Sequence, residues 1–214
     1  MNIAIINYGS GNLHSALKSF EAAASDFKNV SIKLTSSYKE VLSADKIVLP
    51  GVGSFAFCKL NLLENKDVHN ALCDQVIEKK KPFLGICVGM QLLATEGNEG
   101  QRNNKGLDWI SGEVIKIVVD QKFKIPHMGW NSLSFKKYHP LFKDIQVDDH
   151  FYFVHSYEFK AFSENEVIAT TEHSKKIVAA IAKDNIVGLQ FHPEKSQLQG
   201  LKVIKNFIKW DAIS

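Results

Sequence analysis

Cysteine is scarce in this chain. The 214 residues contain only Cys58, Cys73 and Cys87, which lie far apart and form no Cys-x-x-Cys pair. An odd, dispersed set of thiols does not fit a disulfide framework or a structural zinc site. We therefore expect no metal centre, and we expect a cytoplasmic location, where thiols stay reduced.

Long apolar runs and a strong charge of one sign are also missing. No hydrophobic stretch approaches the roughly 20 residues that cross a bilayer. The first residues, MNIAIINYGSGN, lack the basic start and the longer apolar run of a signal peptide. The formal charge is only +3, and the lysines are scattered. We expect neither a membrane nor a nucleic acid as a partner.

The first half of the chain alternates short apolar strands with amphipathic helices. In one predicted helix, Leu13, Leu17 and Phe20 fall on the same face. Such alternation predicts parallel strands that are joined by right-handed crossovers and covered on both sides. The predicted strands are 2–7, 30–34, 46–50 and 83–86, and the predicted helices are 12–25, 36–44, 67–81 and 90–97.

The second half is rich in strands and follows a polar, glycine-rich surface loop predicted over 95–107. Its closely spaced apolar segments predict antiparallel hairpins added to the sheet, and a last helix is predicted over 196–210. No repeat or linker divides the sequence, so we expect one α/β domain over residues 1–214. The predicted strands of this half are 113–119, 124–135, 151–159, 167–173, 177–183 and 186–191.

Cys87 stands in the pattern Gly85-Ile86-Cys87-Val88-Gly89, at the point where an apolar strand gives way to a helix. This pattern is the cysteine counterpart of the nucleophile elbow, in which strand and helix pass so close that the flanking positions tolerate little beyond glycine. The N–H groups at the start of the helix point at the sulfur and favour the nucleophilic thiolate. The alternative is a buried structural cysteine, which is how we interpret Cys58 and Cys73.

A thiolate nucleophile needs a base, and His192 in the segment GLQFHPEKS is the best candidate among eight histidines. Pro193 favours an extended conformation for the residue before it. In an extended segment His192 and Glu194 project from the same face, so Glu194 can accept from one ring nitrogen while the other faces the sulfur. This is the nucleophile–base–orienter arrangement of a catalytic triad, although a purely structural His-Pro-Glu turn is the alternative.

Acyl transfer also needs donors for an oxyanion. The backbone N–H of Val88 is one candidate, and the Gly-Val-Gly loop within LPGVGSF (49–55) offers a second, unless it is a plain β-turn. A dinucleotide site is not expected, because the third glycine of G-x-G-x-x-G would fall at His14. No P-loop is present, and we expect no cofactor.

Together these residues resemble the class I, triad-type, glutamine amidotransferases, and within them the glutaminase subunits of imidazole glycerol phosphate synthase. The motifs NYGSGNL, LPGVGSF, LGICVGMQLL, PHMGWN, FYFVHSY and GLQFHPEKS stand in the family's order and extend over nearly the whole chain. Val88 departs from the commoner leucine, but only its backbone N–H matters to the chemistry. The resemblance implies a flavodoxin-like fold with a mixed central sheet and helices on both faces.

The resemblance also implies roles for individual residues. Cys87 would attack the side-chain amide of glutamine and form a γ-glutamyl thioester, His192 would act as acid and base, and Glu194 would orient His192. The implied oxyanion hole combines Val88 with Val52 or Gly53. The implied substrate contacts are Gln91, His155, Ser156 and Tyr157, and the implied partner contacts are Met128, Gly129, Trp130 and Asn131, although Trp130 could instead belong to the core.

The partner implied by the resemblance is a (β/α)8-barrel cyclase subunit, which would form a heterodimer with this chain and use the ammonia from L-glutamine in histidine biosynthesis. Three alternatives stay open. The chain could be a paralogue that supplies ammonia for amino-sugar synthesis in surface polysaccharides, or a stand-alone γ-glutamyl cysteine hydrolase. It could also be a non-catalytic subunit on the same fold, but such proteins usually lose the nucleophile.

Overall fold

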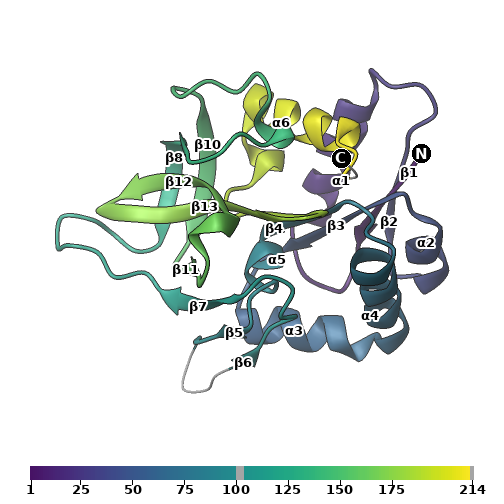
Figure 1. Ribbon diagram of the computed structural model, residues 1–214, viewed down its shortest axis with the longest axis horizontal. Helices are drawn as coiled ribbons and strands as arrows, with labels where there is room; N and C mark the ends of the chain where they lie inside the picture. The colour runs from purple at the N-terminus through teal and green to yellow at the C-terminus, as the bar shows by residue number, and fades with distance from the viewer. Residues whose placement is uncertain (100–103, 213–214) are drawn as a thin grey trace.

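The computed structural model describes residues 1–99 and 104–212, and its centre is an eight-stranded sheet (Figure 1). Parallel pairing joins β2, β1, β3, β4 and β14, and antiparallel pairing adds β13, β12 and β9. In sheet order the strands are β2 (Ser31–Thr35), β1 (Asn2–Ile6), β3 (Lys46–Gly51), β4 (Phe83–Cys87), β14 (Ile186–Leu189), β13 (Lys175–Lys183), β12 (Val167–His173) and β9 (Ser134–Phe135).

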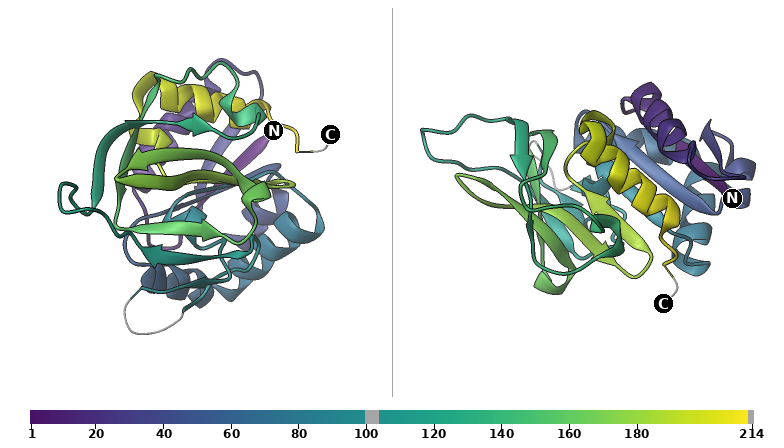
Figure 2. Two further views of the ribbon diagram at one scale, coloured as in Figure 1. Left: turned by 60° about the vertical axis from the view of Figure 1, so that its left-hand side comes forward. Right: turned by 90° about the horizontal axis from the view of Figure 1, so that it is seen from above.

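Helices cover both faces of this sheet. On one face α1 (Leu13–Ala24) packs against α6 (Gln197–Lys209), and on the other α3 (Phe55–Glu64) packs against α4 (Lys66–Cys73) (Figures 1 and 2). Two short helices complete the set: α2 (Tyr38–Ser43) contacts α4, and α5 (Val88–Gln91) follows β4 directly. The mixed sheet between two helical layers confirms the predicted architecture. No helix among the described residues is long and apolar enough to cross a membrane.

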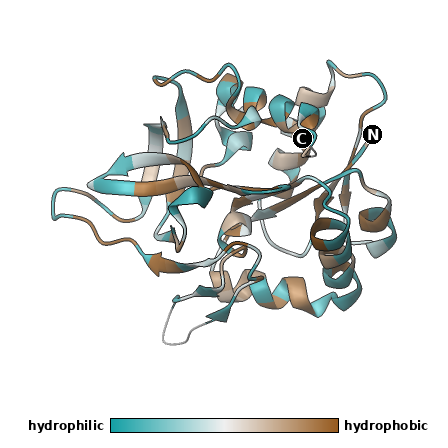
Figure 3. Ribbon diagram, in the orientation of Figure 1, coloured by the Kyte–Doolittle hydropathy of each residue, from teal (hydrophilic) through white to brown (hydrophobic). Residues whose placement is uncertain are grey.

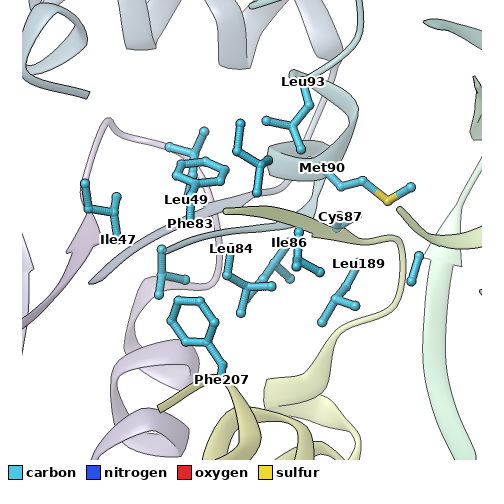
Figure 4. Packing of buried hydrophobic residues seen from close by; sticks show 14 of the residues in the cluster. Ile47, Leu49, Phe83, Leu84, Ile86, Cys87, Met90, Leu93, Leu189 and Phe207 are labelled. Atoms are coloured by element: carbon cyan, nitrogen blue, oxygen red, sulfur yellow. The ribbon is translucent and has the colours of Figure 1, made fainter. Parts of the chain in front are cut away.

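The central strands supply the hydrophobic core. All six residues of β3 and all five of β4 are buried, and these strands are coloured predominantly hydrophobic in Figure 3. Successive side chains of β4 point to opposite faces: Leu84 lies towards Phe207 of α6, whereas Phe83 lies on the other side (Figure 4). Each buried phenylalanine contributes about 1.5–3 kcal/mol of hydrophobic stabilisation. Cys87 therefore stands at the end of a rigid, buried strand.

The second half differs from the prediction, because only part of it joins the central sheet. Two further sheets form beside it, to the left in Figure 1. The first pairs β8 (His127–Ser132) with β10 (His150–His155) in antiparallel fashion. The second has the order β11 (Tyr157–Ala161), β7 (Gly112–Lys116), β5 (Glu96–Gly97) and β6 (Asn104–Lys105).

Two local predictions near the elbow were wrong. The helix predicted over 90–97 ends at Gln91, and the loop predicted over 95–107 contains β5 and β6, apart from 100–103, which lie outside the described residues. The cause is tertiary: the backbone N–H groups of residues 107–110 donate to the carbonyls of residues 92–94. These contacts satisfy the carbonyls just after α5, so the chain does not need to continue the helix.

Candidate active site

The turn that carries Cys87 has the strained geometry of a nucleophile elbow. Cys87 is the last residue of β4 and directly precedes α5, with φ 54° and ψ −111°, a backbone conformation that costs a non-glycine residue roughly 1–3 kcal/mol. A Cβ on Gly89 would lie 1.8 Å from the Leu49 carbonyl oxygen, and one on Gly85 would lie 2.6 Å from the Gly89 carbonyl oxygen. Both positions therefore require glycine, as the sequence pattern predicts.

His192 and Glu194 form a hydrogen-bonded pair at the same edge of the sheet. The Nδ1 atom of His192 lies 2.7 Å from Oε1 of Glu194, and both side chains are at most 3% exposed. The backbone N–H of His192 donates to the Tyr152 carbonyl at 2.9 Å, which anchors the residue to β10. His192 is extended, as predicted from Pro193, but Pro193–Lys195 is a 3₁₀ turn rather than an extended segment. The predicted reason for the pairing was therefore wrong, because this turn and not strand alternation brings the Glu194 carboxylate to Nδ1 of His192.

The raised pKa of His192 fits a histidine that pairs, in its protonated form, with a thiolate. Burial lowers the pKa of His192, but the Cys87 sulfur and the Glu194 carboxylate together outweigh burial and raise the pKa to about 10. In the described part of the chain, Nε2 of His192 has no hydrogen-bond partner other than the Cys87 sulfur. A protonated imidazole beside a thiolate is the arrangement that cysteine nucleophiles use.

Cys87 and His192 line the same cavity, whose volume is about 310 Å³. Cavities of this size lie at the lower end of the range for small-molecule sites. A more open depression of about 650 Å³ lies beside Asn7 and Asn61, but it contains no nucleophile and base together, so we assign the site to the smaller cavity. The residues that line it are Val52, Gly53, Cys87, Val88, Gln91, Glu99, Pro126, Val154, His155, Ser156, Tyr157, His192 and Lys195.

The two candidate oxyanion donors on the Gly-Val-Gly loop differ in availability. The N–H of Val52 donates to Oγ of Ser10 at 3.2 Å, and the carbonyl of Val52 accepts from the same hydroxyl at 2.6 Å. Val52 therefore directs its N–H away from the cavity in this structure. Gly53 lines the cavity with a φ of +112°. Val88 is the first residue of α5, so its N–H has no partner within the helix.

Gln91 is held by a network of amide groups. Its Nε2 donates to the Tyr157 carbonyl at 3.1 Å and to Oε1 of Gln190 at 3.0 Å. Nε2 of Gln190 in turn lies 3.8 Å from the Cys87 sulfur. Gln190 was not among the predicted site residues. Strand alternation offered a signal for it, because residues two apart in a strand, such as Gln190 and His192, project from the same face.

Two charged residues that were not predicted also line the cavity. Glu99 accepts a hydrogen bond from the Phe55 N–H at 2.5 Å, at the start of α3. The ammonium group of Lys195 lies 5.7 Å from the centre of the Tyr152 ring. Opposite charges in one cavity suit a zwitterionic amino acid. Neither residue carries a signal in the sequence, because scattered Lys and Glu are ordinary surface residues.

The four residues predicted to face a partner lie on β8, beside the cavity. Met128 and Trp130 are 65% and 47% exposed, so Trp130 is not a core residue. The Trp130 ring packs edge-to-face on Tyr152, with ring centres 5.9 Å apart. Gly129 has a φ of +135°, and Asn131 points inward to His127 and to the Glu172 carbonyl. Exposed Met and Trp on one strand are typical of an interface.

The remaining thiols are free, and residues 1–99 and 104–212 contain no group of three or more His, Cys, Asp or Glu side chains that could hold a metal ion. Cys58 is fully buried, with its sulfur 3.0 Å from Oγ of Ser10. Burial raises the pKa of both Cys58 and Cys73, which makes them poor nucleophiles. The chemistry of the site therefore rests on Cys87 and its neighbours.

Comparisons with known proteins agree with this geometry. The sequence is 49% identical over 215 residues to "Imidazole glycerol phosphate synthase subunit HisH" of Brucella abortus (strain 2308), with 98% of this chain and 99% of the relative covered. The subunit of the same name from Rhodopseudomonas palustris is 46% identical, with the same coverage. A solved glutamine amidotransferase from Thermotoga maritima has the same fold, with a TM-score of 0.64 at 19% identity, covering 100% of this chain and 86% of that one. The family described as "Glutamine amidotransferase class-I" matches residues 4–210, and this chain belongs to that family.

Proposed function

We propose that this protein hydrolyses L-glutamine to glutamate and ammonia and is the glutaminase subunit of an imidazole glycerol phosphate synthase. The observation that carries the proposal is the convergence of Cys87, His192 and Glu194, with the first two in one cavity. The matched relatives, which bear the name of that synthase's HisH subunit over nearly their whole length, support the pathway.

The chemistry follows from the geometry. The Cys87 thiolate attacks the side-chain amide carbon of glutamine, and the N–H groups of Val88 and of Val52 or Gly53 stabilise the oxyanion. His192 gives its Nε2 proton to the departing nitrogen, so the C–N bond breaks and ammonia leaves a γ-glutamyl thioester. His192 then takes a proton from water, which attacks the thioester and releases glutamate. Glu194 holds the ring and stabilises its charged form.

The rest of the cavity suits the amino acid end of glutamine. The amide nitrogen of Gln91 is used by two protein acceptors, so its oxygen is the atom left to accept from substrate. Glu99 and Lys195 supply a negative and a positive group for the α-ammonium and the α-carboxylate. His155, Ser156 and Tyr157 also line the cavity, next to Gln91.

The need for a partner follows from the chemistry of the product, ammonia. Ammonia is mostly protonated in neutral water and is then useless as a nucleophile, so it must pass directly to a second active site. The relatives are named as subunits, which supports a complex. We propose a one-to-one heterodimer with a (β/α)8-barrel cyclase subunit, docked over Met128, Gly129, Trp130 and Asn131. No metal, cofactor, membrane or nucleic acid takes part.

Two further assignments complete the proposal. The chain acts as a single amidotransferase domain over residues 1–214, and it works in the cytoplasm, where its three thiols remain reduced.

In this structure the N–H of Val52 is bonded to Ser10. We propose that the loop Pro50–Ser54 rearranges when the cyclase binds its nucleotide, so that the glutaminase has little activity without its partner.

The experiment that tests the function is glutamate release from glutamine by the chain alone, with the cyclase subunit, and with the cyclase plus its nucleotide. The rate should be low alone, rise sharply in the full mixture and vanish in Cys87→Ala. The mutant complex should still make imidazole glycerol phosphate from added ammonia.

Other results would change the assignment. Full activity of the isolated chain would indicate a stand-alone hydrolase. No activity in any mixture would favour the polysaccharide paralogue or a non-catalytic subunit. Loss of ammonia-dependent synthesis in Cys87→Ala would mean that Cys87 is structural.

A further inference from the structure

Two buried histidines beside the cavity are linked by a hydrogen bond that the catalytic chemistry does not use. Nδ1 of His127 on β8 lies 2.9 Å from Nε2 of His155 on β10, and the two residues are 3% and 6% exposed. The His127 ring is stacked between Phe153 and His173, with ring centres 4.8 and 4.2 Å away. Neither ring can turn without disturbing its neighbours, so the contact is a fixed part of the structure.

The hydrogen positions on these rings follow from their partners. Nδ1 of His155 lies 2.8 Å from the Tyr157 carbonyl oxygen, which can only accept, so this nitrogen carries the hydrogen. In a neutral ring Nε2 of His155 is then an acceptor, and Nδ1 of His127 must donate to it. Nε2 of His127 is left as an acceptor, and the side-chain nitrogen of Asn131 lies 3.2 Å from it.

The orientation of Asn131 is settled independently of the histidines. Its Nδ2 donates to the Glu172 carbonyl at 2.8 Å, and its Oδ1 accepts from the Ser132 N–H at 2.9 Å. Reversing the amide would place two oxygens and two N–H groups face to face. Nδ2 therefore has one hydrogen for Glu172 and one for His127. In the row of hydrogen bonds that runs from Asn131 through His127 and His155 to the Tyr157 carbonyl, each donor points from β8 towards the cavity.

The row ends on the group that holds Gln91. The Tyr157 carbonyl accepts from Nδ1 of His155 at 2.8 Å and from Nε2 of Gln91 at 3.1 Å, so both of its lone pairs are used. The second hydrogen of Gln91 goes to Gln190. If His155 moved, the carbonyl would lose one of its two donors, and only Gln91 would then remain to fix the geometry of this contact.

We propose that His127 is a positioning residue for the glutamine cavity. It orients His155, and through the Tyr157 carbonyl it fixes the rotamer of Gln91. The substrate contact is thereby connected to Asn131, which lies on the same strand as Met128 and Trp130. The inference rests on the proposed function, because it assigns Gln91 to glutamine. Four successive hydrogen bonds therefore connect β8, on which a partner would dock, with Gln91 in the cavity.

The charge state of both rings agrees with this arrangement. Burial, together with the nearby His155 and His173, lowers the pKa of His127 to about 3. Burial also lowers the pKa of His155 to about 4, although the Tyr157 carbonyl opposes the shift and His173 and His192 add to it. Both rings are therefore neutral at neutral pH, as the donor order requires.

Two substitutions at the same position separate positioning from packing. His127→Phe keeps a buried ring but removes both nitrogens, whereas His127→Asn places an amide N–H where Nδ1 stood. His139→Phe is the matched control, because His139 is a half-buried, neutral histidine that packs on Trp210 and accepts from the Leu141 N–H. Its ring lines no part of the cavity.

The test combines nitrogen NMR of histidine-labelled protein with kinetics of the complex with the cyclase. The wild-type spectra should show hydrogen on Nδ1 of both His127 and His155. His127→Phe should raise KM for glutamine about tenfold, the effect of losing one hydrogen bond, with a smaller change in kcat. His127→Asn should recover most of the affinity, and His139→Phe should keep the wild-type KM. Ammonia-dependent synthesis should stay unchanged throughout.

Three results would overturn the inference: hydrogen on Nε2 of His127 in the wild-type spectra, an unchanged KM in His127→Phe, or an equal defect in His127→Asn and His127→Phe. If His127→Phe does not fold, the spectra and His127→Asn still decide. Absence of any wild-type glutaminase activity would refute the proposed function instead, while the spectra would still report on the hydrogen-bond row.

Discussion

Replacing Glu194 by glutamine removes one negative charge from the site with almost no change in shape. Oε1 of Glu194 lies 2.7 Å from Nδ1 of His192, and the carboxylate side chain is only 3% exposed. A glutamine at this position can still accept a hydrogen bond from Nδ1 through its amide oxygen. The effect of Glu194→Gln on catalysis therefore measures the charge of the orienting residue rather than the contact.

The size of the effect can be bounded from the distance. Two unit charges 2.7 Å apart attract by about 6 kcal/mol at an effective dielectric constant of about 20, which is an upper limit. Because glutamine keeps the hydrogen bond, the loss should be nearer the roughly 1.5–3 kcal/mol typical of hydrogen bonds to charged groups. This predicts a fall in kcat/KM of about 10- to 150-fold. The pKa of His192 should fall from its value of about 10.

The assay is glutamate release by the complex with cyclase and nucleotide, together with a titration of His192 by NMR. Ammonia-dependent synthesis should be unaffected, because it bypasses the glutaminase site. Glu166→Gln is the matched control, since Glu166 is a mostly buried carboxylate whose partner is Lys183 at 3.9 Å, outside the cavity. Wild-type kcat/KM in Glu194→Gln, or an equal loss in Glu166→Gln, would refute an orienting role for Glu194.

Gly89→Ala should destabilise the protein by more than about 3 kcal/mol, because the new Cβ would lie 1.8 Å from the backbone of β3. Gly188→Ala should cost only about 1–3 kcal/mol, because its new Cβ would lie 2.6 Å from the flexible Met90 side chain. Equal losses of unfolding free energy in the two variants, measured with denaturant, would contradict the backbone clash. Trp130→Ala should weaken cyclase binding and leave the melting temperature nearly unchanged, because the ring is 47% exposed; a large drop in melting temperature with normal binding would count against an interface. The pKa of His192 is raised from 6.5 to about 10, so its stabilising contribution is complete below about pH 6.5 and is lost as the pH rises through about 10. The stability difference between wild type and His192→Gln should shrink over that window, and a difference independent of pH would exclude the charged ring.

Several features were accessible from the sequence because short-range sterics determine them. The elbow is an example: Gly85 and Gly89 flank Cys87 because the strand and helix on either side leave no room for a Cβ. The alternation of apolar strands and helices likewise predicted the layers of the first half. His192 and Glu194 were found because they are close in sequence, although the structure pairs them through a 3₁₀ turn and not through an extended strand.

Tertiary structure alone decided the contacts that join distant segments. The end of α5 at Gln91 depends on N–H groups that arrive from residues 107–110, and the direction of the Val52 N–H depends on Ser10, which lies 42 residues earlier. The row from Asn131 to Gln91 links three strands and a helix. A local pattern determines backbone shape through nearby sterics, but a hydrogen bond between distant residues depends on how whole elements pack. The sequence therefore predicted Cys87 as the nucleophile and His192 as its base, and the packing of the sheets decided how the cavity around them is held.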